Sequence, residues 1–440
     1  MKYLKIMLFA LALILLGGIW YLYPTLKLGA GFAAKMACSC HYIQGRTLED
    51  IKAKDLNFSI LPMIALDHNE ENKTVKATFF GAISQQATFV KGHGCILEVD
   101  EAIPLPKERG WAVYDTIFNP LHTYDTLPAG INLAALEKAV DHTFEPLEEG
   151  GTRGLVVLHD GHLLTERYAD GFDAGTPLYG WSMTKSITNA LIGMLVKEEK
   201  LSLDQDHLFP EWENDERANI TLADLLHMNS GLEWNEAYGT VSDATQMLYG
   251  QTDMAAYTRD KPQAQQPNTH WVYSSGTTNL LSKIIRETIG DDDAYLSLVY
   301  DRLFTPLGMT SALIEPDQSG TLVGSSYGWA TARDWAKFGQ LYLDKGRVGD
   351  QQLLPESWIA FSQEAANGSA GIYGAQIWLQ TEDASNAPED VFMFRGFQDQ
   401  RIVIIPSRKC VIVRLGKNKD QTFPLDRLIK EVLAGVRGEE

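Results

Sequence analysis

The stretch from Gly180 to Gln205, GWSMTKSITNALIGMLVKEEKLSLDQ, constrains the fold more than any other part of the chain. Apolar residues such as Ile187 and Leu191 recur at spacings of three and four, which predicts a long and largely buried helix. Ser182 and Lys185 stand three residues apart at its start. Side chains at that spacing share one face of a helix, so the hydroxyl and the amine can come within hydrogen-bond reach.

The buried amine gives this SxxK pair its chemistry. Burial and a nearby helix N-terminus both disfavour the charged form of a lysine. We therefore expect Lys185 to be neutral at working pH, to take the proton of Ser182 and to make that serine a nucleophile. Chance alone yields roughly one or two SxxK matches in a chain of this length. The preceding segment, GLVVLHDGHLLTERYADG, adds weight because it predicts a hairpin that turns at Asp160 and Gly161.

A hairpin followed by a buried SxxK helix resembles the serine β-lactamase and penicillin-binding protein superfamily. The segment HWVYSSGTTNLLSKIIRETIG is similar to the second motif of that superfamily, a tyrosine followed two residues later by a polar residue. The resemblance implies that Tyr273 is the general acid/base that works with Ser182 and Lys185. It also implies that Ser275 binds substrate, at a position where many relatives carry asparagine.

The third motif of the superfamily, often Lys-Thr-Gly on a strand edge, is altered in this chain. Phe394 stands at the lysine position, Arg395 at the threonine position, and Gly396 keeps backbone room for a substrate lying along the strand. The resemblance implies that Arg395 and Gly396 bind substrate, and that the backbone N–H groups of Ser182 and Phe397 form the oxyanion hole. Neighbouring strand residues point to opposite faces, so we expect Arg395 to face away from the pocket.

A second candidate nucleophile lies in the segment GSSYG, which matches the GxSxG elbow of α/β-hydrolases around Ser326. Those enzymes place the acid and then the histidine after the serine in chain order. The last histidine of this chain is His270, so that triad cannot be completed. We therefore interpret the residues that follow, Thr331, Arg333 and Asp334, as structural.

The N-terminus carries an uncharged run from Ile6 to Leu26, preceded by Lys2 and Lys5. This run is about long enough to cross a bilayer, and Trp20 and its tyrosine neighbours suit an interfacial belt. A cleaved signal peptide is the alternative, although its apolar stretch is usually shorter. We predict a single-pass anchor over residues 1–29 in a bacterial inner membrane, with the remaining chain in the periplasm.

The rest of the chain divides into two predicted parts. Short strand-like runs predict a small β-containing region over residues 30–125. Residues 131–438 form the predicted hydrolase domain. For this domain the resemblance implies a mixed α/β (α+β) fold of the β-lactamase/transpeptidase type. Its antiparallel sheet would be flanked by terminal helices, and a mostly helical subdomain would hold the SxxK helix.

Charge and cysteine content limit the partners. The formal net charge of -19 argues against nucleic acid, because phosphate binding needs a basic face. In an oxidising compartment we expect Cys95 to form a disulfide with Cys38 or Cys40. Cys40 and His41 are not matched by a second cluster at zinc spacing, so we predict no metal site and no cofactor.

The resemblance implies a serine hydrolase similar to class C β-lactamases, family VIII esterases and 6-aminohexanoate-dimer hydrolases. Its substrate would be a small ester or amide rather than a β-lactam, because Phe394 cannot supply the charge that holds a carboxylate. The alternatives are a D-amino-acid peptidase or β-lactamase that acts on cell-wall-like substrates, and a catalytically silent envelope binding domain of the same fold.

Overall fold

A five-stranded antiparallel sheet, in the order β12-β13-β14-β5-β6, forms the centre of the structure. Its strands are β5 (Gly150–His159), β6 (His162–Tyr168), β12 (Phe392–Gly396), β13 (Gln400–Ile405) and β14 (Cys410–Asn418). This computed structural model describes residues 2–109, 121–147, 150–418 and 422–436, without the side chains of residues 2, 4–6, 8 and 10–21.

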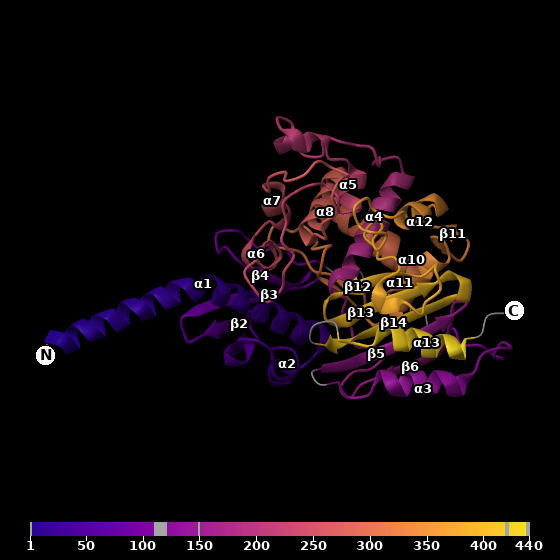
Figure 1. Cartoon of the computed structure of the whole chain (residues 1–440), viewed down its shortest axis with the longest axis horizontal. Coiled ribbons are helices and arrows are strands. Elements are labelled where there is room, and N and C mark those ends of the chain that lie inside the picture. The colour runs from indigo at the N-terminus through magenta and orange to yellow at the C-terminus, as the bar shows by residue number, and fades with distance from the viewer. Residues whose placement is uncertain (1, 110–120, 148–149, 419–421, 437–440) are drawn as a thin grey trace.

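Helices cover both faces of this sheet (Figure 1). They are α3 (Leu133–Thr143), α11 (Ala332–Leu343) and α13 (Leu425–Gly435). Strand β5 shows why both faces are covered, since its successive side chains point to opposite sides. Leu155 and Val157 pack with α3 and α13, whereas Val156 and Leu158 belong to the larger core that contains α11. The predicted antiparallel sheet flanked by terminal helices is therefore confirmed.

A mostly helical subdomain lies above the sheet in Figure 1, as predicted. Its helices are α4 (Thr184–Lys197), α5 (Leu222–Leu226), α6 (Asp243–Gly250), α7 (Met254–Arg259), α8 (Ser275–Ile289), α9 (Asp292–Val299), α10 (Thr305–Leu307) and α12 (Glu356–Ser362). Two small antiparallel sheets complete the domain, one of β7 (Leu178–Tyr179), β9 (Gly328–Ala330) and β8 (Leu313–Ile314), the other of β10 (Arg347–Val348) and β11 (Gln351–Gln352).

The SxxK helix is shorter than the long helix predicted for residues 180–205. A 3-10 turn, η3 (Trp181–Met183), precedes α4, and α4 ends at Lys197. At the end of α4, Glu199 adopts a φ of 58°, and this left-handed conformation stops a helix. The residues of α4 from Thr184 to Leu195 are all buried, as their apolar spacing predicts.

The N-terminal region combines a long helix and a short one with a separate four-stranded sheet. The helices there are α1 (Lys2–Gln44) and α2 (Leu48–Lys54). The strands, paired in sequence order, are β1 (Ala65–Asn69), β2 (Thr74–Phe79), β3 (Ile83–Val90) and β4 (Gly94–Glu98). Helix α1 runs without a break across position 30, where we placed the boundary between the predicted anchor and the β-containing region.

The predicted membrane anchor lies on the first half of α1, which projects from the body of the molecule in Figure 1. Most side chains of the apolar run, including all of residues 10–21, lie outside the described residues. Within the part of the chain that the structure describes, no helix combines the length and apolar character needed to cross a bilayer. The anchor therefore stays a prediction.

The second half of α1 packs against the main domain. Its small residues Ala30, Ala33, Ala34 and Ala37 are fully buried in a core shared with β2, β3 and β4. The same core includes Trp181 and Trp329 of the main domain. The N-terminal region is consequently joined to the residues around the SxxK turn by apolar packing.

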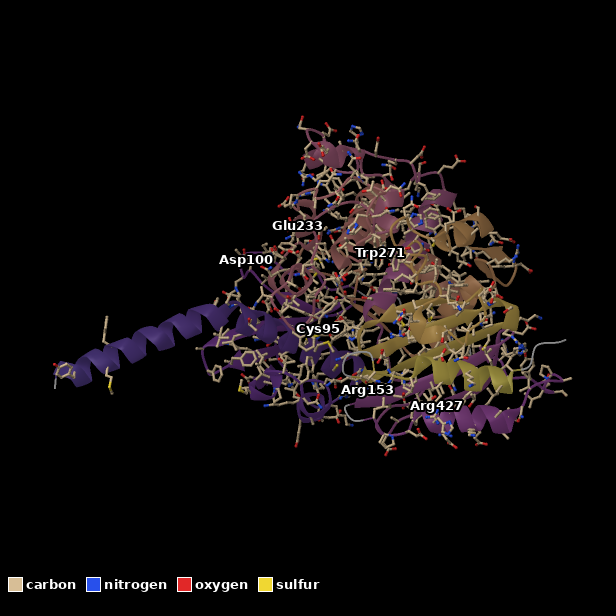
Figure 2. The ribbon with its side chains drawn as sticks, in the orientation of Figure 1. Cys95, Asp100, Arg153, Glu233, Trp271 and Arg427 are labelled. Carbon is tan, nitrogen blue, oxygen red and sulfur yellow. A yellow bond between two sulfur atoms is a disulfide. The ribbon has the colours of Figure 1, made fainter. Side chains whose placement is uncertain are left out.

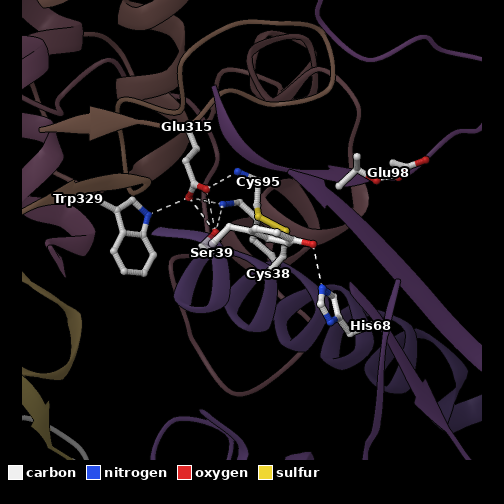
Figure 3. Close-up of a disulfide and its surroundings, with 10 residues drawn as sticks. Cys38, Ser39, His68, Cys95, Glu98, Glu315 and Trp329 are labelled. Atoms are coloured by element: carbon white, nitrogen blue, oxygen red, sulfur yellow. Dashed lines mark hydrogen bonds and ion pairs between the residues drawn. A yellow bond between two sulfur atoms is a disulfide. The ribbon is translucent and has the colours of Figure 1, made fainter. Parts of the chain in front are cut away.

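A buried carboxylate, Glu315, ties this junction together (Figure 3). It forms an ion pair with Lys35 of α1 and accepts hydrogen bonds from the Ser39 hydroxyl (2.8 Å) and the Trp329 indole N–H (2.8 Å). The backbone N–H of Cys95 donates to the same carboxylate at 2.6 Å. Fully buried charges are stable only when paired and hydrogen-bonded in this way, so the network defines how α1 docks.

A disulfide joins Cys38 of α1 to Cys95 of β4 beside that network (Figure 3). The predicted bond from Cys95 to Cys38 or Cys40 is thereby confirmed with Cys38 as the partner. Cys40 is buried as a free thiol. Residues two apart on a helix point to different faces, which is why only one of the two cysteines meets β4.

Candidate functional site

Ser182 lies on a turn whose backbone is held in an unusual conformation. Trp181, the residue before it, is 3% exposed and adopts a φ of 50°, in the left-handed region that bulky residues rarely occupy. Such a conformation persists only where the surrounding packing enforces it. At Gly180 a Cβ atom would overlap the ring of Trp335, so only glycine fits there. The turn therefore presents Ser182, half-buried, at a defined position.

Lys185 lies directly beneath this serine on the first turn of α4. Its amine is buried and donates to the Ser182 hydroxyl at 3.1 Å, to the Ser275 hydroxyl at 2.9 Å and to the Ser325 carbonyl at 2.9 Å. Burial lowers the pKa of Lys185 to about 8, although the charge of Glu236 acts in the opposite direction. A neutral amine is thus accessible near neutral pH, within reach of the serine proton.

Glu236 is the functional residue that the sequence did not reveal. Its carboxylate accepts hydrogen bonds from the Ser275 backbone N–H (2.8 Å), the Trp234 indole N–H (2.6 Å) and the Tyr238 hydroxyl (2.9 Å). The hydroxyl of Ser275 also donates to it. Because Glu236 lies on a loop 39 residues before Ser275, no spacing rule connects the two. The side chains form a relay from Lys185 through Ser275 to Glu236.

The structure shows Ser275 within the lysine network, and the substrate-binding role that the resemblance implies for it stays a prediction. Its side chain is fully buried at the start of α8, between Lys185 and Glu236. We assigned it to substrate binding, but its described contacts all belong to the lysine network. A hydroxyl can both accept from the amine and donate to the carboxylate, so Ser275 links Lys185 to Glu236 through two hydrogen bonds.

Tyr273 stands beside the same amine, with its ring centroid 4.9 Å from the Lys185 nitrogen. Rings of Trp271, Tyr373 and Trp378 enclose it, with centroids 5.3 to 6.4 Å away. Trp271 is labelled in Figure 2. Burial and then the charge of Glu236 raise the pKa of Tyr273, while its interaction with Ser182 lowers it. Tyr273 therefore stays protonated at neutral pH and suits the role of proton donor.

The altered third motif lies on β12. Phe394 is fully buried against Phe338 and Tyr342 of α11, with ring centroids 5.3 and 4.9 Å away. Arg395 points to the other face, where it pairs with Asp383 at 2.8 Å. Its guanidinium also lies 5.0 Å from the ring centroid of Trp378. The guanidinium is therefore engaged in an ion pair, and it packs on Trp378, one of the rings that surround Tyr273.

Gly396 and Phe397 bring β12 against the SxxK turn. We expected Gly396 to leave room for substrate, but a Cβ atom there would overlap the carbonyl oxygen of Gly180. Glycine is therefore needed for the close approach of strand and turn, and substrate binding at Gly396 stays a prediction. Phe397 follows with its ring 5.4 Å from that of Trp181. The oxyanion hole formed by the N–H groups of Ser182 and Phe397 stays a prediction.

The rival nucleophile, Ser326, is 1% exposed, and its hydroxyl lies 3.0 Å from that of Ser325. The residues interpreted as structural have structural contacts. Thr331 caps α11, Arg333 pairs with Glu166, and Asp334 accepts from the Ser311 backbone N–H at 2.9 Å. Within the described residues, no group of three His, Cys, Asp or Glu side chains could hold a metal ion.

Comparison with known proteins agrees with this geometry. The beta-lactamase family model matches residues 140–434. The 6-aminohexanoate-dimer hydrolase of Paenarthrobacter ureafaciens is 24% identical over 319 residues, which cover 66% of this chain and 79% of that protein. A penicillin-binding protein homologue from Caulobacter crescentus has a TM-score of 0.56 at 16% identity, covering 71% of this chain and 99% of its own. A family VIII carboxylesterase has a TM-score of 0.54 at 13% identity, covering 69% and 97%.

The lysine network predicts a pH dependence of Ser182 reactivity. Only neutral Lys185 can accept the serine proton, so the rate of labelling by a fluorophosphonate probe should rise about tenfold per pH unit below pH 8 and level off above it. Glu236→Gln removes a charge that raises the pKa of Lys185, so the midpoint should move to lower pH. Labelling rates of both proteins, measured from about pH 5 to about pH 10, test this prediction.

The matched control is Glu233→Gln on the same loop, an exposed residue labelled in Figure 2, which should leave the midpoint unchanged. If the midpoint of the pH–rate profile is unchanged or higher in Glu236→Gln, the carboxylate of Glu236 does not raise the pKa of Lys185. Thermal melting of both variants separates this effect from loss of folding, because Glu236 accepts several buried hydrogen bonds.

Proposed function

The chain belongs to the beta-lactamase family and is a serine hydrolase, and on that premise we propose that it cleaves small uncharged esters or amides through an acyl-enzyme on Ser182. The observation that carries the proposal is the buried amine of Lys185, 3.1 Å from the Ser182 hydroxyl. A serine beside a desolvated lysine is a nucleophile with its own base.

In the proposed reaction, neutral Lys185 takes the proton as the oxygen of Ser182 attacks the carbonyl carbon. The negative charge that develops on the carbonyl oxygen is stabilised by the N–H groups of Ser182 and Phe397. Tyr273 donates its proton to the leaving alcohol or amine as the ester or amide bond breaks, and regains one from Lys185. Water then attacks the acyl-enzyme, its proton returns to Ser182 through the same groups, and the carboxylic acid leaves.

The preference for uncharged substrates rests on β12. Penicillin-recognising relatives hold the substrate carboxylate with a strand-edge lysine, and here Phe394 stands at that position and is buried in the core. Arg395 is already paired with Asp383. The loss of a charge-assisted hydrogen bond weakens binding of an anionic substrate by about 1.5 to 3 kcal/mol, roughly ten- to a hundredfold.

The named relatives support the same bond types. One is a hydrolase of an aminohexanoate dimer and another is a carboxylesterase. Both names describe enzymes that cleave a bond to a carbonyl carbon.

We also propose that the enzyme is anchored in the inner membrane and faces the periplasm. The apolar run from 6 to 26 supports this, as do large exposed apolar side chains on the projecting half of α1, namely Tyr3, Met7, Phe9, Leu22 and Tyr23. The disulfide between Cys38 and Cys95 favours an oxidising compartment.

The nucleophile assignment predicts a clear difference between two serines. Ser182→Ala should abolish covalent labelling and reduce ester hydrolysis by at least about a thousandfold, leaving only the contribution of binding and the oxyanion hole. Ser326→Ala, at a buried serine in the rival motif, should leave labelling intact. Peptide mapping after fluorophosphonate treatment identifies the modified residue. Labelling on Ser326 would overturn the proposed mechanism.

The altered third motif predicts the order of substrates. The kcat/KM for p-nitrophenyl butyrate should exceed that for a chromogenic cephalosporin, since only the cephalosporin carries a carboxylate that needs a partner. Arg395→Ala should change ester hydrolysis by less than about fivefold, because its partly exposed ion pair contributes little. A cephalosporin rate that is higher than the ester rate and collapses in Arg395→Ala would show that the arginine replaces the missing lysine.

The anchor predicts that the full chain stays with the membrane pellet after carbonate extraction, because a spanning apolar helix resists removal by alkali and salt. Immunoblotting of pellet and supernatant measures this, with a chain that begins at position 30 as the control. Recovery of the full chain in the carbonate supernatant would exclude a spanning anchor.

A further inference from the structure

An apolar pocket lies between α1 and the loops beside Ser182. Its cavity volume is about 110 Å³, and it is partly open to solvent. Its outer wall includes Leu28 and Phe32 of α1 together with Ile60, and its inner wall includes Trp181, Tyr238 and Phe397. None of the residues that line it carries a charge. A cavity of this composition suits a hydrocarbon group rather than a polar or ionic ligand.

The inner wall of the pocket is formed by neighbours of the catalytic residues, although Ser182 itself is not among the lining residues. Trp181 precedes the nucleophile, and its ring is 6.3 Å from that of Phe32 and 5.4 Å from that of Phe397. The ring of Phe397 is stacked on that of Tyr238 at 5.1 Å, and the Tyr238 hydroxyl donates to Glu236. The pocket therefore lies beside the turn that carries Ser182 and beside the loop that carries Glu236.

The outer wall comes from a part of the chain that precedes the family match. Residues 25–61 contribute Leu28, Phe32 and Ile60, whereas the family model begins at residue 140. Helix α1 is held in place by the buried pair of Lys35 and Glu315 and by the Cys38–Cys95 disulfide. The pocket is thus formed by firmly docked elements, and its outer wall lies outside the residues that the family model matches.

We propose that this pocket binds the aliphatic acyl chain of the substrate, so that the enzyme prefers esters or amides of medium-chain fatty acids. The proposal rests on the acyl-enzyme mechanism above and names its substrate class. The acyl half is assigned because two lining residues adjoin the proposed position of the acyl carbonyl: Trp181 directly precedes Ser182, and Phe397 supplies a proposed oxyanion-hole N–H. The leaving group must lie near Tyr273, so the acyl chain is the part directed towards the pocket.

A series of p-nitrophenyl esters tests this with the full chain. From acetate through butyrate to octanoate, kcat/KM should rise about fourfold for each methylene that enters the pocket. Val241→Trp, at a partly exposed position of the lining, fills the pocket and should reduce the octanoate-to-acetate ratio at least about tenfold. The matched control is Leu133→Trp on α3, which is also exposed and should leave the ratio unchanged.

A second measurement does not depend on turnover. Isothermal titration of the uncharged amide octanamide into Ser182→Ala should show saturable binding, which Ser182→Ala/Val241→Trp should lose and Ser182→Ala/Leu133→Trp should keep. If wild-type protein reacts with the fluorophosphonate probe but shows no chain-length dependence, and Ser182→Ala does not bind octanamide, the pocket assignment is wrong and the proposed function stands. If Ser182 is unreactive and no ester is cleaved, the proposed function fails, and the acyl-chain assignment, which rests on it, fails as well.

Discussion

The burial of one amine, that of Lys185, is the constraint on which the catalytic half of the structure depends. A charged lysine in the core is unfavourable unless polar atoms surround it, and here two serine hydroxyls and a carbonyl do so. The same burial lowers its pKa towards neutrality. Stability and reactivity therefore have one origin: the groups that allow Lys185 to be buried also place its proton-accepting nitrogen at Ser182.

A second constraint is the close approach of three backbone segments around the nucleophile. The carbonyl of Gly180 occupies the space where a side chain at Gly396 would lie, and Trp335 occupies the space beside Gly180. Trp181 is held at positive φ between these contacts. Strain of this kind is retained when dense packing leaves no alternative, and it fixes the direction in which Ser182 points.

The N-terminal region packs against the catalytic domain and lines the apolar pocket beside it. The buried ion pair of Glu315 with Lys35 holds α1 against the catalytic domain, and α1 in turn supplies one wall of the apolar pocket. An interaction far from Ser182 in sequence thus holds one wall of the pocket in place. Residues 22–24 of α1 are exposed, and the pocket lining begins at the next residue, Thr25. The part of α1 before the pocket projects from the molecule in Figure 1.

Helix and strand geometry was enough to predict the features that depend on residues close together in the sequence. The three-residue spacing of Ser182 and Lys185, the apolar period of α4 and the hairpin of β5 and β6 follow from helix and strand geometry, and the structure has all three. The sequence also limited the disulfide to Cys95 and one of two neighbouring cysteines. Only the tertiary structure decided that Glu236 faces Ser275, that Gly396 serves backbone packing, and that α1 lines a pocket. Each of these depends on contacts between distant segments, which periodicity and spacing do not encode.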